Sequence, residues 1–196
     1  PGLPLEDALA AAEAWYAARG LPLKVQVPVE ARRLLDAELG ERGWPAVQAT
    51  DVLAARLDLL GDDSPSAAVR LDAEPDDSWL AHYRGGAGLD LTARALLVRH
   101  EQVAFASVRD GDDVLAIGRG VIDGEWLGVS AVEVDPARRR RGLASAVMAA
   151  LWQWGREQAA TRSYLQVEAE NEPALALYER LGYWLHHSYH YRLNPR

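Results

Sequence analysis

Two hydrophobic periods alternate along this chain and predict a protein that mixes helices with strands. Apolar residues spaced three or four positions apart indicate a helix, and strict alternation indicates a strand. The first sixty residues read helix, strand, helix, strand, with expected bounds of 5–19, 21–27, about 30–39 and part of 46–60. The segment 61–66 combines glycine, proline and acidic residues without an apolar anchor, so it is the best linker candidate.

The pattern after this segment predicts an antiparallel meander. A short strand at 67–71 and a short helix at 75–83 come first, and 91–98 fits either type of element. Alternating strands follow at 102–109, 114–122 and 125–134. The dipeptide Asp123-Gly124 joins the last two strands and is a strong hairpin signal.

The stretch 132–183 organises the rest of the chain. Pro136 breaks the last meander strand, and a long amphipathic helix opens at Gly142. A strand at 164–169 and a short helix closed by Gly182 follow. A helical crossover normally returns the chain to a parallel strand. The predicted fold class is therefore α/β (α+β): a mixed, mostly antiparallel sheet with helices on both faces.

Composition and charge narrow the classes of function. The 196 residues carry a net charge of −8 and no cysteine, which argues against nonspecific nucleic-acid binding and excludes a thiol nucleophile or a thiolate metal site. No apolar run is long enough to cross a bilayer and no signal peptide is evident, so we expect a cytoplasmic protein without a membrane partner. Acidic residues gather between Asp58 and Asp77, and we interpret them as a solvated surface rather than an amine-attracting patch.

The arginine-rich turn before the long helix has the chemistry of an anion site. A helix N-terminus offers unpaired backbone N–H groups and a partial positive charge, and Gly142 lets the backbone approach a ligand closely. Arg139, Arg140 and Arg141 would add charge-assisted pairing to phosphate oxygens. A solvated arginine run remains the alternative for this turn taken alone.

Two motifs in this region resemble those of the GNAT superfamily of acetyl-CoA-dependent N-acetyltransferases. Arg139-x-x-Gly142-x-Ala144 matches the first motif, Q/R-x-x-G-x-G/A, within residues 132–145. Asn171-x-x-Ala174-x-x-x-Tyr178-x-x-x-Gly182-Tyr183 resembles the second, within 166–183. The resemblance extends from about residue 102 to 191. It implies acetyl-CoA as co-substrate, with coenzyme-binding groups at Val132, Val134, Arg139, Arg140, Arg141, Gly142, Leu143, Ala144 and Asn171.

The resemblance also implies catalytic roles. The backbone N–H near Val134 would stabilise the oxyanion, and Tyr178 would protonate the leaving thiolate, although its spacing also fits an apolar helix stripe. Some relatives carry a glutamate base where this chain has Gln166, so we rank Glu168 first and Glu133 second as the base. No metal site is expected.

The acceptor is predicted to be a primary amine of a small molecule, such as an amino acid. Arg119, Arg94 or the histidines at 186–190 could bind its carboxylate, although no residue pattern identifies the acceptor. A protein or peptide acetyltransferase and a non-catalytic acetyl-CoA sensor remain alternatives. Oligomeric state is unknown.

Two regions are predicted: residues 1–62 and a catalytic GNAT domain at 63–196. The element order in the first sixty residues repeats that of the last fifty, including Gly43-Trp44 against Gly182-Tyr183. Residues 1–60 are therefore either a degenerate GNAT half-unit that binds no coenzyme or an ordinary αβαβ extension. A strand order unlike that of the C-terminal elements would contradict the repeat.

Overall fold

The structure is a computed structural model that describes residues 2–61, 67–86 and 91–195. Most of the predicted linker, residues 62–66, lies outside the described residues. The helices are α1 (Leu5–Ala17), α2 (Arg33–Glu41), α3 (Asp77–His82), α4 (Leu91–Val98), α5 (Leu143–Glu157) and α6 (Glu172–Arg180). The strands are β1 (Lys24–Pro28), β2 (Ala46–Arg56), β3 (Val69–Asp72), β4 (Val103–Asp110), β5 (Asp113–Asp123), β6 (Trp126–Val134), β7 (Arg162–Glu168) and β8 (Trp184–Leu193).

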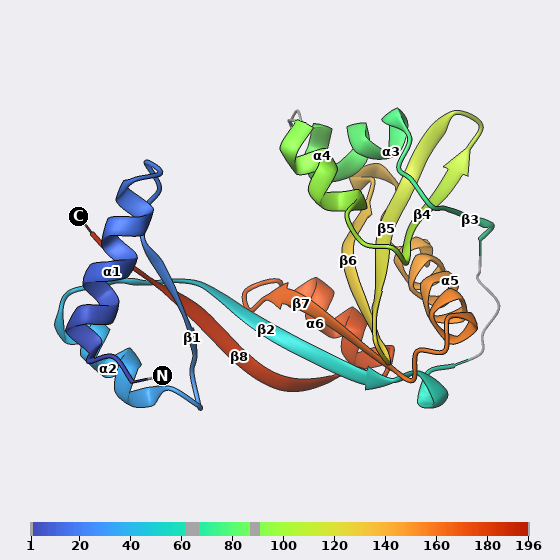
Figure 1. Cartoon of the computed structure of the whole chain (residues 1–196). Coiled ribbons are helices and arrows are strands. Elements are labelled where there is room, and N and C mark those ends of the chain that lie inside the picture. The colour runs from blue at the N-terminus through green and yellow to red at the C-terminus, as the bar shows by residue number, and fades with distance from the viewer. Residues whose placement is uncertain (1, 62–66, 87–90, 196) are drawn as a thin grey trace. The chain divides into compact units, whose positions relative to one another are not determined.

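The strands hydrogen-bond in the order β1-β8-β2-β7-β6-β5-β4-β3. Strands β3 to β6 pair antiparallel, whereas β7 returns parallel to β6 after helix α5. The predicted mixed sheet and its parallel return are confirmed, and the ambiguous segment 91–98 is helix α4 (Figure 1). Chain order did not predict that β2 pairs between β8 and β7.

Contacts group the chain into two compact units, which we describe separately. The first unit consists of Pro1–Val52, Val167–Asn171 and Leu185–Arg196, and the second of Leu53–Gln166 and Glu172–Trp184. These units are defined by packing and are discontinuous in sequence. The division into functional regions at 1–62 and 63–196 stays a prediction.

The first unit encloses a small apolar core beneath its two helices. Its buried members come from both helices, from β1 and from the loops beside them: Leu9, Leu23, Val27, Leu39 and Trp44. A polar cluster lies beside this core, where Asp36 Oδ1 accepts hydrogen bonds from His190 Nε2 and Arg192 Nε, both at 2.7 Å. These partners give His190 a structural role.

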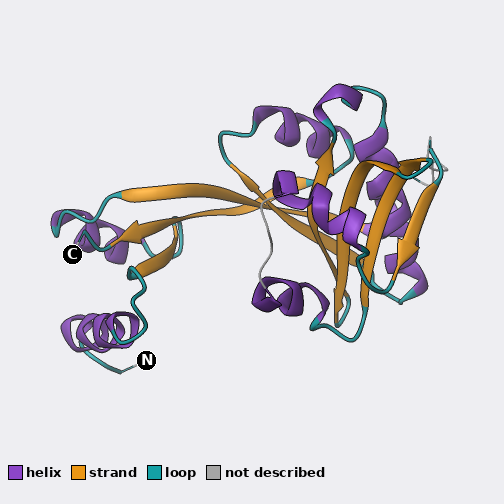
Figure 2. Ribbon diagram, turned by 90° about the horizontal axis from the view of Figure 1, so that it is seen from above, coloured by secondary structure: helices purple, strands orange, loops and turns teal. Residues whose placement is uncertain are grey.

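The second unit has helices on both faces of its strands (Figure 2). Helix α5 packs so tightly on β5 that a Cβ at Gly118 would lie 2.4 Å from Val147 Cγ1. The opposite face is covered around Trp79, whose indole nitrogen donates to Ala106 O at 3.0 Å and whose ring meets Phe105 edge-on. This two-sided packing fixes β5 and β6, which carry the candidate site. None of the helices within the described ranges combines the length and apolar character that a membrane span needs.

Candidate functional site

Strand β6 has an open edge in its second half. Its parallel register with β7 runs from Trp126↔Arg162 to Val129↔Leu165 and goes no further along either strand. On the other side, β6 stays paired with β5 as far as Val134↔Ala116. The edge that faced β7 is therefore available to a ligand over the last residues of β6.

The amide of Val134 points toward this open edge. Asp135 N donates to Leu115 O at 2.9 Å, toward β5, and successive amides of a strand point to opposite edges. The N–H of Val134 therefore points away from β5. A β-bulge lies just before it, where the register between β5 and β6 shifts after Ile117 and Ala131 takes a φ of 54°. The bulge separates the paired half of β6 from its open half.

A tight turn connects β6 to helix α5. The Asp135 carboxylate accepts from Ala137 N at 2.7 Å, and Arg138 N donates back to Asp135 O at 2.8 Å. The turn then passes through two left-handed residues, Arg140 at φ 62° and Gly142 at φ 77°. Gly142 is the N-cap of α5 and provides no side chain, so the first N–H groups of the helix lack a side-chain cap.

Positive charge surrounds this helix start. Arg139, Arg140 and Arg141 are exposed, and none of them forms an ion pair within the described part of the chain. Unpaired guanidinium groups next to uncapped helix amides favour an anion with several oxygen atoms. The arrangement fits the pyrophosphate of a nucleotide-containing coenzyme.

Tyr178 lies on α6 and is nearly buried, with 8% of its surface exposed. Burial raises the pKa of its hydroxyl, so the phenol stays protonated at neutral pH. The hydroxyl has no hydrogen-bond partner among the described residues, where every fully buried side-chain oxygen or nitrogen has one. It therefore keeps a reachable surface, as a proton donor to a ligand must.

A buried hydrogen-bond chain lies beside Tyr178, and sequence reasoning missed it. The Tyr183 ring lies 6.0 Å from the Tyr178 ring, edge to face. The Tyr183 oxygen accepts from Trp152 Nε1 at 3.0 Å and lies 2.7 Å from Ser163 Oγ, which donates to Leu127 O at 3.1 Å. This directional chain holds Tyr183, and through it the wall against which Tyr178 packs.

The remaining predicted site residues differ in position. Glu133 is opposite Ile117 in the β5–β6 register, so the two side chains share the face covered by α3. The Val132 side chain is on the α5 face, near Gly118. Glu168 and Asn171 belong to the first unit. The backbone N–H of Asn171, just before α6, donates to Glu168 O at 2.9 Å. Glu133, Tyr178 and the turn at 139–144 belong to the second unit.

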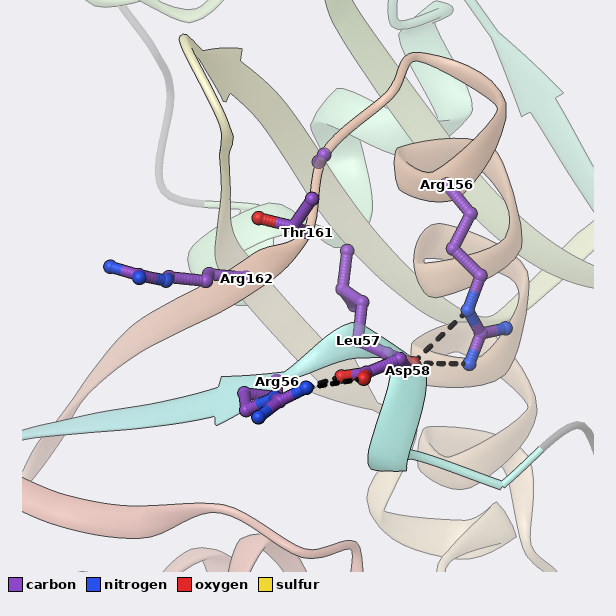
Figure 3. A pocket seen from close by; sticks show the side chains of 7 residues that line it. Arg56, Leu57, Asp58, Arg156, Thr161 and Arg162 are labelled. Carbon is purple, nitrogen blue, oxygen red and sulfur yellow. Dashed lines mark hydrogen bonds and ion pairs between the residues drawn. The ribbon is translucent and has the colours of Figure 1, made fainter.

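A separate pocket of about 410 Å³ lies at the other end of β7, where that strand begins. Figure 3 shows Arg56 and Asp58 pointing toward each other and Arg156 reaching the Leu57 carbonyl, while Arg162 points away from them. Arg56 Nη2 lies 2.6 Å from Asp58 Oδ2. Arg156 donates to Leu57 O from Nη2 at 2.7 Å and from Nε at 3.1 Å. Arg56 and Asp58 pair with each other in this pocket and Arg156 is bound to backbone carbonyls, so we assign the pocket no role in catalysis.

No group of three metal-ligating side chains occurs within the described ranges. His186 and His187 contact each other through their Nδ1 atoms at 2.9 Å, and His190 is bound to Asp36. The late histidines therefore do not converge on one point.

Comparison with known proteins gives three relevant similarities. The family model described as "Probable histone acetyltransferase Rv0428c C-terminal" matches residues 4–192. Probable histone acetyltransferase Rv0428c of Mycobacterium tuberculosis is 32% identical over 184 residues, which cover 91% of this chain and 55% of that protein. Mycothiol acetyltransferase of Clavibacter sepedonicus is 32% identical over 167 residues, covering 78% of this chain and 55% of that protein. The chain thus spans about half the length of these two relatives.

Among solved structures, a GCN5-related N-acetyltransferase from Kribbella flavida has a similar fold. It superposes with a TM-score of 0.74 at 20% identity, covering 100% of this chain and 79% of that chain. At this identity the similarity concerns the fold, and the predicted GNAT fold is confirmed.

Proposed function

This chain belongs to the family of the Rv0428c C-terminal region, and from that membership we propose that it is an acetyl-CoA-dependent N-acetyltransferase. The resemblance to the GNAT superfamily that the two motifs indicated is confirmed by the family match and by the fold. The proposal concerns transfer of an acetyl group to an amine, in a protein that we expect to be cytoplasmic.

The observation that carries this proposal is the open edge of β6 beside an uncapped helix start. After Val129 the strand has no β7 partner in register, and nine residues after Val134 helix α5 begins at Leu143. The pantetheine arm of acetyl-CoA would bind along the edge as an added strand, with amides at Val132 and Val134. Its pyrophosphate would bind the turn at 139–144. Asn171 remains a proposed contact of the pantetheine.

The proposed reaction is a direct transfer between two bound substrates. A neutral amine attacks the thioester carbonyl, so an N–C bond forms and the C–S bond breaks. The amide of Val134 would stabilise the oxyanion of the tetrahedral intermediate. The sulfur leaves as a thiolate and takes the proton of the Tyr178 hydroxyl, and the proton lost by the amine passes to a carboxylate or to solvent. Both substrates are bound together, and no acetyl-enzyme forms.

Two carboxylates are proposed as the base. Glu133 lies in the same unit as Tyr178 and on the face opposite α5. Glu168 lies two residues beyond Gln166 on β7 and shares its strand face. Glu133→Gln and Glu168→Gln distinguish them, because loss of the true base moves the acidic limb of the pH profile. A profile unchanged in both variants would indicate that the amine loses its proton to solvent.

The acceptor is proposed to be a small primary amine. The names of the two relatives point to different acceptors, since one is called a histone acetyltransferase and the other a mycothiol acetyltransferase. The experiment that separates these classes is a panel of amino acids, polyamines, aminoglycosides and peptides, with coenzyme A release as the readout. Transfer to peptides alone would favour the protein acetyltransferase, and binding without turnover would favour a sensor.

Coenzyme binding is tested directly by titration calorimetry with acetyl-CoA. Replacing Arg139, Arg140 and Arg141 together by glutamine should weaken binding and reduce its dependence on salt, because phosphate contacts are electrostatic. Arg70→Gln is the control, since Arg70 is an exposed arginine on β3 that already pairs with Asp72 at 2.8 Å. Absence of heat with the parent protein would refute the proposed function.

A further inference from the structure

We propose that Arg119 binds an acidic group of the acceptor, so that the amine substrate is an amino acid or another amine with a distal carboxylate. This inference rests on the proposed acetyl-transfer function and assigns the substrate class within it. It starts from Arg119, a partly buried cation on β5 that forms no ion pair with the described part of the chain.

The Arg119 side chain is held in place by the backbone. Its Nε and Nη2 both donate to the carbonyl of Leu97, at 2.9 and 2.7 Å. The guanidinium carbon lies 5.9 Å from the centre of the Phe105 ring. Two bonds to one carbonyl fix the plane of the group, which leaves its Nη1 side for another partner.

Among the described residues, no carboxylate forms an ion pair with Arg119. Burial lowers the pKa of Arg119, and the nearby phenols of Tyr83 and Tyr164 act on it in the opposite direction. Every fully buried side-chain nitrogen in the described residues has a hydrogen-bond partner, so the unpartnered Nη1 is within reach of solvent. A desolvated cation with an accessible donor favours an anion from outside.

The neighbours of Arg119 lie on the face of the sheet opposite α5. Arg119 is opposite Ser130 in the register with β6, and the Tyr164 hydroxyl lies over Gly128, where a Cβ would approach it to 2.8 Å. Glu133, one of the two proposed bases, shares this face. This face of the sheet therefore brings together the Arg119 cation on β5, the Glu133 carboxylate on β6 and the Tyr164 hydroxyl from β7.

The spacing along β6 limits the acceptor. From Ser130 to Val134 is four residues, a rise of about 13 Å along a strand. An acceptor whose amine and acidic group are separated by several bonds fits this distance better than one with both on the same carbon.

The test uses the full chain with acetyl-CoA and a series of ω-amino acids from β-alanine to 6-aminohexanoate. Each acid is compared with its primary amide, which has the same shape without the charge. We expect kcat/KM to favour the acid by roughly 10- to 100-fold at the best chain length, mainly through KM, because the contact is a charge-assisted hydrogen bond.

Three variants show whether Arg119 is the cause. Arg119→Gln should bring the ratio of acid to amide close to one, and Arg119→Lys should retain part of the preference. Arg109→Gln is the matched control, since Arg109 lies on the neighbouring strand β4 and pairs with Asp76 at 2.8 Å. It should leave the ratio unchanged.

Several results would overturn the inference. Equal rates for acids and amides in the parent protein would do so, as would a preference that survives in Arg119→Gln. A lower melting temperature in Arg119→Gln with an unchanged ratio would show that Arg119 only anchors Leu97. These results differ from failure of the proposed function, in which no amine is acetylated at all.

Discussion

Replacing Tyr178 by phenylalanine tests the proposed general acid most directly. The substitution removes one hydroxyl and keeps the ring of a residue that is 8% exposed. Loss of a general acid typically lowers turnover by roughly 100- to 10,000-fold. We expect kcat to fall within this range. The dissociation constant of acetyl-CoA should stay within about twofold, because its proposed binding contacts lie on β6, on the turn at 139–144 and at Asn171.

The stability of this variant should hardly change. The Tyr178 hydroxyl has no hydrogen-bond partner among the described residues, so its removal leaves no group unpaired. We expect the free energy of unfolding to change by less than about 0.5 kcal/mol. Turnover is measured by thiol release, affinity by calorimetry and stability by urea titration.

Tyr183→Phe is the matched control, because it also removes one tyrosine hydroxyl, but one that forms hydrogen bonds within the protein. Trp152 Nε1 and Ser163 Oγ, at 3.0 and 2.7 Å, would both lose a partner in a buried site. Leaving a buried donor unpaired costs about 1–3 kcal/mol. The two variants should therefore differ in effect: Tyr178→Phe lowers kcat, whereas Tyr183→Phe lowers the free energy of unfolding.

The pH dependence gives a second readout. Burial raises the pKa of Tyr178 above its ordinary value of about 10. The acid is active while protonated, so kcat of the parent should fall only above this value, and the fall should vanish in Tyr178→Phe. If turnover of Tyr178→Phe is within twofold of the parent, Tyr178 is not the acid.

Three further variants probe the packing and the turn. Gly142→Ala places a Cβ at φ 77°, so acetyl-CoA affinity measured by calorimetry should fall about tenfold, and unchanged affinity would contradict a close backbone approach. Gly118→Ala directs its methyl at Val147, 2.4 Å away, and should cost about 1–3 kcal/mol in urea unfolding, part of which Val147→Ala should restore. Burial alone would raise the pKa of Asp76, but hydrogen bonds from its neighbours and from Arg109 lower it to about 2 from 3.8. The ionised Asp76 carboxylate therefore stabilises the folded state above pH 3.8, and this stabilisation is lost as the pH falls through 2. Over that range, the melting temperature of the parent should fall more than that of Asp76→Asn.

Local signals in the sequence predicted most of the elements because each has a local cause. The left-handed glycines end or begin helices where the pattern requires it, as Gly142 and Gly182 do at φ 77° and 90°. The Asp123-Gly124 turn has Gly124 at φ 57° and joins β5 to β6 as expected. These features depend on neighbouring residues alone.

Features that depend on distant pairing had no such signal. Ala131 takes a φ of 54° although alanine has no preference for it, because the β5–β6 register imposes the bulge. The partners of Tyr183 come from α5 and β7, and Arg119 bonds to a carbonyl 22 residues away. Sequence reasoning named Arg119 only as one of several carboxylate partners, because its lack of a counter-charge appears only in the packed structure.

Coenzyme stoichiometry tests the expectation that a degenerate N-terminal half-unit binds no coenzyme. Helices α2 and α6 start at positions 33 and 172, and the glycines that follow them stand at 43 and 182, so both pairs differ by the same 139 residues. The helix ends are alike: Trp44 N bonds Leu39 O as Tyr183 N bonds Tyr178 O, both at 3.0 Å.

The strand order agrees with a repeat. Exchanging β1 with β7 and β2 with β8 turns the order β1-β8-β2-β7 into its own reverse, as a two-fold repeat requires. At the same offset, Leu39 stands where the C-terminal half has Tyr178, and Arg32 where it has Asn171. A half-unit without these side chains and without an arginine-glycine turn has no means of binding or using acetyl-CoA, so calorimetry should give one coenzyme per chain. Binding of two equivalents of acetyl-CoA per chain would contradict this prediction, because the N-terminal half would then hold a second coenzyme site.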